Sequence, residues 1–256
     1  MTDKIRVGIQ LHPQHTTYPA YAEAVQRVEA MGADTIFNWD HFFPIYGESN
    51  GNHFEGWTLL TAMASLTSRA EVGCLVTGTG YRNPQLLADM ARTVDHISGG
   101  RLILGIGAGW NRRDYTEYGY PFGTAKDRVN AFSQALPLLV DRLGRLTPPP
   151  TRHIPLLIGA AGEKVMLRLV AQYADIWNTF GPPENFKKKS AILDEWCIKV
   201  DRKPADIERS ITFEADELDQ LNGYLDVGAT HFIMGAGSPF DFESMERLVK
   251  WRDKVN

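Results

Sequence analysis

Short runs of β-branched and other apolar residues alternate with longer amphipathic segments along the whole chain. Apolar runs of about 4–8 residues between turn signals are typical of buried strands. A segment with helical spacing of apolar residues follows each such run. Eight runs are predicted as strands: Arg6–Leu11, Thr35–Trp39, Val72–Thr77, Leu102–Ile106, Pro155–Ile158, Asp175–Asn178, Ser210–Phe213 and Thr230–Met234.

Three of the predicted helices carry clear end signals. The first begins near Pro19 and stops at Gly32, a residue type that ends helices in the left-handed conformation. Another begins at Asn83-Pro84, a capping residue followed by proline at the first helical position. A third opens with a capping box over Thr124–Asp127, in which aspartate replaces the usual glutamate.

Strand–helix units in which no two strands are adjacent predict a parallel sheet, because each parallel return needs a crossover. Eight units favour an α/β fold of the closed (β/α)₈ TIM-barrel type, with an open doubly wound sheet as the alternative. The length of 256 residues is close to the roughly 250 of one such barrel. Residues 1–256 are therefore expected to form a single domain.

Charge and composition exclude several partners. Formal net charge is −4 and the two signs are interspersed, which does not indicate a nucleic-acid surface; Lys187–Lys189 is expected to be a solvated helix face. No signal-peptide core and no run of about 20 apolar residues is present, so no membrane partner is expected. Cys74 and Cys197 are isolated. A cytoplasmic protein with free thiols is predicted.

In a (β/α)₈ barrel the active site lies at the carboxyl ends of the strands. Asp40 and His41 follow the second predicted strand and can exchange or orient protons near neutral pH. We expect His41 to contact the reacting ring or substrate and Asp40 to fix its neighbours. The alternative is an aspartate that caps a loop beside a hydrogen-bonded histidine. A metal site is a further alternative, although its candidates match no metal motif: His12, His15, Asp40, His41, His53 and Glu55.

Glycine-rich turns supply the next candidates. Gly159–Gly162 leads into a helix expected from about Glu163 to Tyr173, where free amides and small residues predict a phosphate site. The alternatives are a tight turn without a ligand, or a phosphate site at Gly235–Ser238 after the last strand. Gly105–Gly109 lacks the spacing of a dinucleotide fingerprint and is expected to make room for a flat ring.

Aromatic residues are also concentrated near the predicted barrel mouth, where they can wall a planar cofactor and an apolar substrate. We expect a functional role for Trp39 and Trp110 and ordinary packing for many of the others. The full set is Trp39, Phe42, Phe43, Tyr81, Trp110, Trp177 and Phe180.

Several motifs, taken together and in order, resemble the luciferase-like monooxygenase superfamily. The resemblance extends roughly from Arg6 to Asn178 and is strongest to the actinobacterial branch that uses coenzyme F420, a deazaflavin. The motifs are Val76–Pro84, Ser98–Arg101, Gly105–Trp110, Tyr118–Phe122, Gly162–Lys164 and Tyr173–Asp175.

The resemblance implies a luciferase-like (β/α)₈ barrel, dimeric, that binds coenzyme F420 or alternatively FMN across its carboxyl face. It places a non-prolyl cis peptide at Cys74–Leu75 beside the ring and the cofactor phosphate on the backbone of Ala160–Gly162. Asp40 and His41 match the catalytic Asp-His pair beside the ring. Residues expected to bind the cofactor are His12, Trp39, Cys74, Leu75, Thr77, Gly107, Ala108, Gly109, Trp110, Gly159, Ala160, Ala161, Gly162 and Asn178.

Two departures from the family pattern bear on function. Sugar-phosphate dehydrogenases of this group have an acidic glutamate where this chain has Trp110, which argues against that reaction. The insertion before the fifth predicted strand is shortened to Gly144–His153, which predicts a more open cleft.

The resemblance thus implies an oxidoreductase that transfers a hydride between reduced coenzyme F420 and a small organic substrate. His41 is expected to donate a proton or position the ring. The alternatives are an FMN-dependent monooxygenase, a barrel that binds the cofactor without turnover, and a metal-dependent hydrolase or isomerase. The residues expected to meet the acidic tail of the cofactor are Arg82, Arg112, Arg113 and Lys164.

Overall fold

The computed structural model describes residues 4–256, and over that range the strands are all parallel. Each predicted strand is present with its outer ends shifted by at most two residues, and the predicted strand Val72–Thr77 is divided into two pieces. The strands are β1 (Arg6–Leu11), β2 (Thr35–Asn38), β3 (Glu71–Cys74), β4 (Thr77–Gly78), β5 (Leu102–Gly107), β6 (Leu156–Gly159), β7 (Ile176–Thr179), β8 (Glu208–Phe213) and β9 (His231–Ala236).

The sheet closes on itself. Its order is β3-β2-β1-β9-β8-β7-β6-β5-β4, and β3 also pairs with β5. Since β3 and β4 are two parts of one interrupted strand, the described residues form an eight-stranded barrel. The closed barrel is confirmed, and the open doubly wound sheet is wrong.

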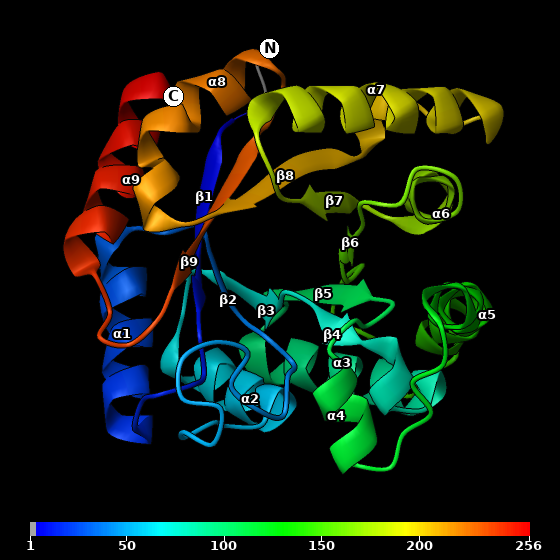
Figure 1. Cartoon of the computed structure of the whole chain (residues 1–256), viewed down its shortest axis with the longest axis horizontal. Helices are drawn as coiled ribbons and strands as arrows, with labels where there is room; N and C mark the ends of the chain where they lie inside the picture. The colour runs from blue at the N-terminus through cyan, green and yellow to red at the C-terminus, as the bar shows by residue number, and fades with distance from the viewer. Residues whose placement is uncertain (1–3) are drawn as a thin grey trace.

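Helices surround the strands, as Figure 1 shows. The expected end signals are present: Gly32 is a left-handed cap, Asn83 caps its helix, and Thr124 and Asp127 form the capping box. The helices are α1 (Tyr18–Met31), α2 (Gly56–Leu66), α3 (Pro84–Ser98), α4 (Arg112–Glu117), α5 (Ala125–Leu143), α6 (Met166–Tyr173), α7 (Pro183–Lys199), α8 (Leu221–Asp226) and α9 (Phe242–Val255), with 3₁₀ turns η1 (Thr79–Tyr81), η2 (Pro204–Asp206) and η3 (Ala215–Gln220).

The break between β3 and β4 carries a non-prolyl cis peptide, as the resemblance implied, but at Leu75–Val76. The predicted position, Cys74–Leu75, is wrong by one residue. The reason lies in the ladder with β2: Cys74 still pairs with Asn38, and the amide of Leu75 donates to the Asn38 carbonyl at 2.8 Å. The regular strand therefore continues through Cys74 and the chain departs from it one residue later.

Apolar side chains pack on both faces of the barrel wall. The interior of the barrel holds a small cluster that consists of Phe37, Leu75, Ile103, Leu157, Ile176 and Ile233. A much larger core lies between the strands and the surrounding helices. Filling the interior makes the barrel a packed core, so a ligand can enter only at an end.

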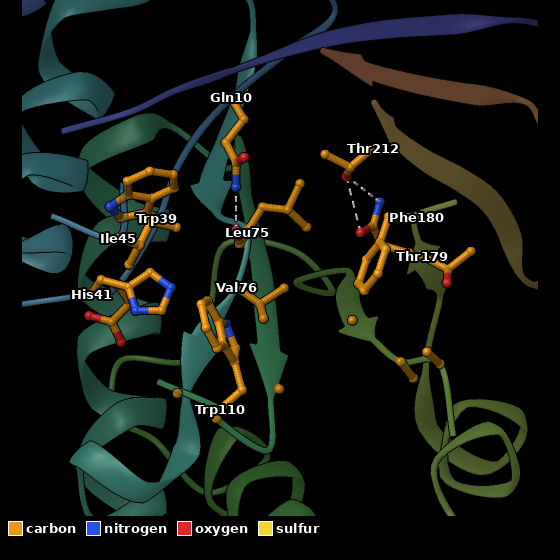
Figure 2. Close-up of a pocket in the computed structure, with 18 of the residues that line it drawn as sticks. Gln10, Trp39, His41, Ile45, Leu75, Val76, Trp110, Thr179, Phe180 and Thr212 are labelled. Atoms are coloured by element: carbon orange, nitrogen blue, oxygen red, sulfur yellow. Dashed lines mark hydrogen bonds between the residues drawn. The ribbon is translucent and has the colours of Figure 1, made fainter. Parts of the chain in front are cut away.

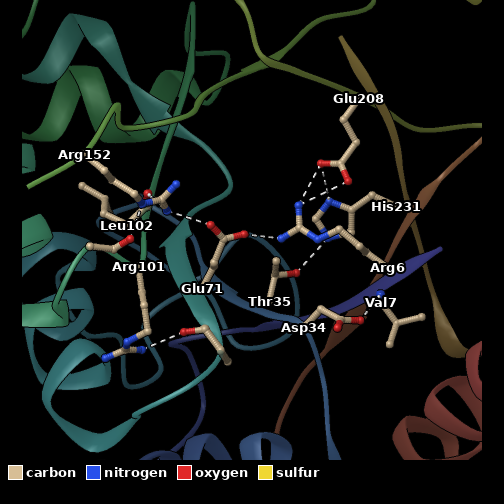
Figure 3. Close-up of polar contacts among 12 residues, drawn as sticks. Arg6, Val7, Asp34, Thr35, Glu71, Arg101, Leu102, Arg152, Glu208 and His231 are labelled. Carbon is tan, nitrogen blue, oxygen red and sulfur yellow. Dashed lines mark hydrogen bonds and ion pairs between the residues drawn. The ribbon is translucent and has the colours of Figure 1, made fainter. Parts of the chain in front are cut away.

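Charged side chains close the amino end of the barrel. Arg6, Glu71, Glu208 and His231 are the first residues of β1, β3, β8 and β9, so their side chains meet at one edge. Figure 3 shows Arg6 between the two glutamates. The Arg6–Glu208 distance is 3.1 Å, and Arg152 lies 2.7 Å from the other side of Glu71. This end is therefore occupied by mutually paired charges.

Candidate active site

A cavity of about 740 Å³ opens at the carboxyl ends of the strands. Its walls include the last residues of five strands, and it is mainly apolar (Figure 2). The lining residues are Gln10, His12, Trp39, Asp40, His41, Ile45, Tyr46, Leu75, Val76, Gly78, Tyr81, Gly107, Ala108, Gly109, Trp110, Gly159, Ala160, Ala161, Met166, Asn178, Thr179, Phe180, Gly181, Thr212, Phe213, Glu214 and Glu217.

Most of the residues predicted from the sequence meet in this cavity. Three of the expected cofactor-binding residues lie outside its walls: Cys74, Thr77 and Gly162. Thr77 is fully buried and accepts a hydrogen bond from the indole of Trp57 at 3.0 Å. Cys74 is also buried, and burial raises the pKa of its thiol. Both belong to the wall of the barrel, while Gly162 follows the lining residue Ala161 directly.

His41 is held by a carboxylate that the sequence did not reveal. Its Nδ1 lies 2.6 Å from Oδ2 of Asp114 on α4, and Asp114 is fully buried. The ring of His41 stands edge-on to Trp110 and to Trp39, with centroids 5.4 and 5.7 Å apart (Figure 2). His41 is thus a rigidly placed imidazole at the cavity wall.

Asp40, the neighbour of His41, points to a different partner. Its carboxylate is buried and accepts two hydrogen bonds from Arg82, one of them 2.8 Å long; Arg82 also lies 2.9 Å from Glu55. Burial raises the pKa of Asp40 to about 6, and the contacts with Arg82 oppose that rise. Arg82 was expected to meet the acidic tail of a cofactor, but both its terminal nitrogens are occupied by these carboxylates.

Two further histidines in and beside the cavity are neutral at physiological pH. Burial lowers the pKa of both His12 and His53 to about 4. His12 stacks on Trp39 with ring centroids 4.2 Å apart and contacts the Tyr46 hydroxyl. The Trp39 indole donates to Nε2 of His53 at 3.1 Å. Trp39 is thereby fixed between the two rings, which supports its predicted place in the cavity wall.

The Gly159–Gly162 turn lies at the end of β6, but α6 begins at Met166, three residues later than expected. Within residues 4–256 the amides of Ala161 and Gly162 have no hydrogen-bond partner, and no side chain caps α6. The ammonium of Lys189 donates to the Ala161 carbonyl at 2.6 Å. Its side chain is only 12% exposed, whereas that of Lys188 is 66% exposed, so the predicted solvated face is wrong for Lys189.

The aromatic residues divide into two groups. Trp110 is 63% exposed and Phe180 is 70% exposed, and they lie on different sides of the cavity in Figure 2. Trp177, by contrast, is fully buried against Phe186 of α7, so its predicted place at the mouth is wrong. Neighbouring residues in a strand face opposite sides, and Asn178 takes the inward position.

Several cavity residues were missed by sequence reasoning. Gln10 donates to the Leu75 carbonyl, and Tyr46 arrives on the long loop after β2. Glu214 and Glu217 follow β8; burial, together with Asp216 and Glu217, raises the pKa of Glu214. The position of Glu214 directly after a strand was the sequence signal that could have identified it as a cavity residue.

Within residues 4–256 no group of three His, Cys, Asp or Glu side chains could hold a metal ion, and no helix there is long and apolar enough to cross a membrane.

Comparisons with known proteins agree with this geometry. The solved structure of an F420-dependent secondary alcohol dehydrogenase in complex with an F420-acetone adduct has a TM-score of 0.86 at 16% identity, covering 96% of this chain and 98% of that one. The coenzyme F420-dependent tetrahydromethanopterin reductase of Methanopyrus kandleri has a TM-score of 0.78 at 17% identity, with the same coverage. Monooxygenase RslO1 of Streptomyces bottropensis has a TM-score of 0.68 at 16% identity, covering 95% and 96%. These likenesses show the (β/α)₈ barrel fold.

The family follows from the sequence match. The model of the family described as luciferase-like monooxygenase matches residues 2–215, so the chain belongs to this family of oxidoreductases. An uncharacterized protein of Mycobacterium tuberculosis is 31% identical over 137 residues, 48% of this chain and 49% of that protein. The phthiodiolone/phenolphthiodiolone dimycocerosates ketoreductase of the same species is 26% identical over 212 residues, 76% and 54%. The chain spans about half the length of the curated relatives it matches.

Proposed function

We propose that this protein is an F420-dependent oxidoreductase that transfers a hydride between reduced deazaflavin and a small, uncharged carbonyl or enone substrate. The observation that carries the proposal is the position of His41, whose imidazole faces an apolar cavity at the catalytic end of the barrel. Both solved structures with the highest TM-scores quoted above are of F420-dependent enzymes, which supports the choice of cofactor.

The cavity fits a flat ring that carries a phosphate. Its floor is formed by Leu75, Val76 and the Gly107–Gly109 turn, whose small size leaves room for a ring. The free amides of Ala161 and Gly162 and the nearby ammonium of Lys189 suit a phosphate. A bound deazaflavin would supply the hydride, while the protein supplies orientation and a dry surface.

His41 is the residue proposed to exchange a proton with the substrate oxygen. Reduction of a carbonyl requires a proton at the oxygen when the hydride arrives at carbon, and oxidation of an alcohol requires its removal. His12 is held neutral by burial, and Asp40 is committed to Arg82, so neither is suited to this exchange. Asp40 acts instead as a positioning residue for the loop that carries His41.

The charges of the cavity wall restrict the substrate. Among residues 4–256, neither lysine nor arginine lines the cavity, whereas Asp40, Glu214 and Glu217 do. Beside His41, away from the Ala161–Gly162 turn proposed for the cofactor phosphate, an anionic substrate such as a sugar phosphate would lose its hydration without gaining an opposite charge. The exposed rings of Trp110 and Phe180 favour an apolar, uncharged molecule.

Equilibrium binding of oxidised coenzyme F420 and of FMN to the apo protein, followed by fluorescence quenching, tests the proposal. We expect tight and selective binding of the deazaflavin. Preference for FMN would instead support an FMN-dependent monooxygenase, the second candidate, which the family description and the fold of RslO1 favour. Binding of neither cofactor would contradict both.

Assembly as a homodimer is part of the same proposal. The adjacent helices α3 and α5 carry several exposed apolar side chains, a composition that favours a protein–protein contact. They are Leu86, Ile97, Leu138 and Val140. Sedimentation equilibrium would show a dimer; a monomer at micromolar concentration would contradict this part of the proposal.

A further inference from the structure

The carboxylate of Asp114 is fully buried beside the cavity and accepts three hydrogen bonds. Oδ2 accepts from His41 Nδ1 at 2.6 Å and from the Tyr81 hydroxyl at 3.1 Å, and Oδ1 accepts from the Phe42 amide at 2.9 Å. Burial alone would raise its pKa, but these hydrogen bonds outweigh burial and the pKa of Asp114 lies below its ordinary value. The group is therefore an anion at neutral pH.

An ionised carboxylate can only accept hydrogen bonds, so Nδ1 of His41 must carry a proton. Nε2 is then the ring nitrogen left to exchange a proton, and within residues 4–256 it has no hydrogen-bond partner. The Phe42 amide and Tyr81 hold the carboxylate from two other directions. The orientation of the imidazole is consequently set by a group that does not itself line the cavity.

We infer that Asp114 is a positioning residue that fixes the tautomer and orientation of His41, with Nδ1 protonated and Nε2 presented to the substrate oxygen. This inference rests on the proposed role of His41 in proton exchange. In the reductive direction His41 starts as the imidazolium and gives its Nε2 proton to the carbonyl oxygen, which leaves the neutral tautomer protonated on Nδ1. A bound reduced deazaflavin would supply the hydride to the carbonyl carbon. In the oxidative direction both transfers reverse.

The other groups around His41 do not offer this contact. Asp40 is bound to Arg82, and His53 accepts from the Trp39 indole. The Trp39 and Trp110 rings make T-shaped contacts with His41, at interplanar angles of 79° and 75°. Within residues 4–256, Asp114 is the hydrogen-bond acceptor for Nδ1 of His41. The arrangement parallels the general pattern in which a buried carboxylate orients a catalytic imidazole.

Asp114→Asn tests the inference because an amide has one acceptor oxygen and one donor nitrogen. Three donors face this site, so the amide nitrogen must meet at least one of them, and the Nδ1-protonated tautomer loses its advantage. Glu117→Gln is the matched control: it removes one carboxylate from the same helix, and this side chain is 57% exposed. Tyr81→Phe is a milder second variant, which removes a single donor to Asp114.

The first readout is the ¹⁵N NMR spectrum of histidine-labelled apo protein, with His41 assigned by its absence in His41→Asn. We expect protonated Nδ1 in the native protein and in Glu117→Gln, and loss of that tautomer in Asp114→Asn. The second readout is steady-state kinetics, where kcat of Asp114→Asn should fall by about 100-fold with KM nearly unchanged.

Native His41 protonated only on Nε2 would overturn the inference, as would an Asp114→Asn variant with native kcat. If Asp114→Asn fails to fold, the spectrum of the native protein decides the question: His41 protonated on Nδ1 supports the inference, and His41 without a proton on Nδ1 contradicts it. In Tyr81→Phe the other two donors to Asp114 remain, so the same tautomer should persist. The NMR result needs no cofactor. Failure of the proposed F420 activity would therefore leave a protonated Nδ1 intact and be recognised separately.

Discussion

The two ends of the barrel differ in what surrounds their buried titratable groups. At the amino end, Arg6 bridges Glu71 and Glu208, and His231 lies 3.3 Å from Glu208. These contacts outweigh burial and lower the pKa of Glu208 to about 2, so the charged form is the stable one. At the carboxyl end, burial keeps His12 neutral and raises the pKa of Asp40 to about 6.

The residues that stabilise this barrel and those that line its cavity lie at opposite ends of the strands. At the amino end the charged side chains are paired with one another. The carboxyl end has an open cavity and the His41 imidazole, whose Nε2 has no hydrogen-bond partner within residues 4–256. In barrels of this kind, residues at the amino ends of the strands serve stability and those at the carboxyl ends serve function. Substitutions at the two ends should therefore have separable effects.

His41→Asn should give the largest effect, confined to the carboxyl end. Asparagine places an amide nitrogen near the position of Nδ1, so the hydrogen bond to Asp114 can persist while Nε2 is lost. We expect kcat to fall by about 100- to 10,000-fold. The free energy of unfolding should change by less than about 1 kcal/mol. Kinetics and urea unfolding on the same preparation check both; a variant with native kcat would contradict the role of His41.

Glu208→Gln should give the opposite pattern. The substitution removes the negative charge that Glu208 presents to Arg6 and His231. The Arg6 side chain is 24% exposed and that of Glu208 is 20% exposed. We expect a loss of about 2–3 kcal/mol in the free energy of unfolding with kcat unchanged. Glu246→Gln, which breaks an exposed pair with Lys250, is the control and should cost less than about 0.5 kcal/mol.

The pH dependence of this loss sharpens the assignment to Glu208. Its pKa falls from 4.5 to about 2 on folding, so its contribution is complete above about pH 4.5 and disappears as pH falls toward 2. The difference in unfolding free energy between the native protein and Glu208→Gln should narrow over that window. A difference that stays constant from neutral pH to pH 2 would mean that another group is responsible.

Lys189→Ala should have an intermediate effect that depends on the ligand. Loss of the ammonium beside the Ala161 carbonyl should weaken binding of F420 or FMN by about 10-fold, or 1.4 kcal/mol. The corresponding molecules without phosphate should bind as to the native protein. Lys188→Ala is the matched control, because that neighbouring side chain is exposed. Equal weakening with and without the phosphate would show that Lys189 acts only on the turn.

Trp110→Ala should have the smallest effect. Its ring is 63% exposed, so the free energy of unfolding should change by no more than about 0.5 kcal/mol. Loss of an apolar wall should raise KM a few-fold, by about 1 kcal/mol of binding, with kcat nearly unchanged. Steady-state kinetics with a series of ketones of increasing chain length checks this. A large fall in kcat would mean that Trp110 also orients His41.

The barrel can be predicted from the sequence because the signals for its strands and helices are local. Apolar runs, caps and turns each occupy a few consecutive residues, and Gly32, Asn83 and Thr124 mark helix ends directly. The partners inside the site are not local: Asp114 is 73 residues from His41, and the residues around it in the sequence do not indicate that contact. The same holds for Lys189, whose burial depends on how α7 packs on the β6 turn.

Anaerobic mixing of the protein with reduced coenzyme F420 and a small uncharged ketone is the direct test of hydride transfer by this protein. We expect oxidation of the coenzyme in step with formation of the alcohol, with a deuterium label passing from the deazaflavin ring carbon to the product. No turnover under these conditions, together with oxygen consumption when reduced FMN is supplied in air, would contradict the claim and identify a flavin monooxygenase.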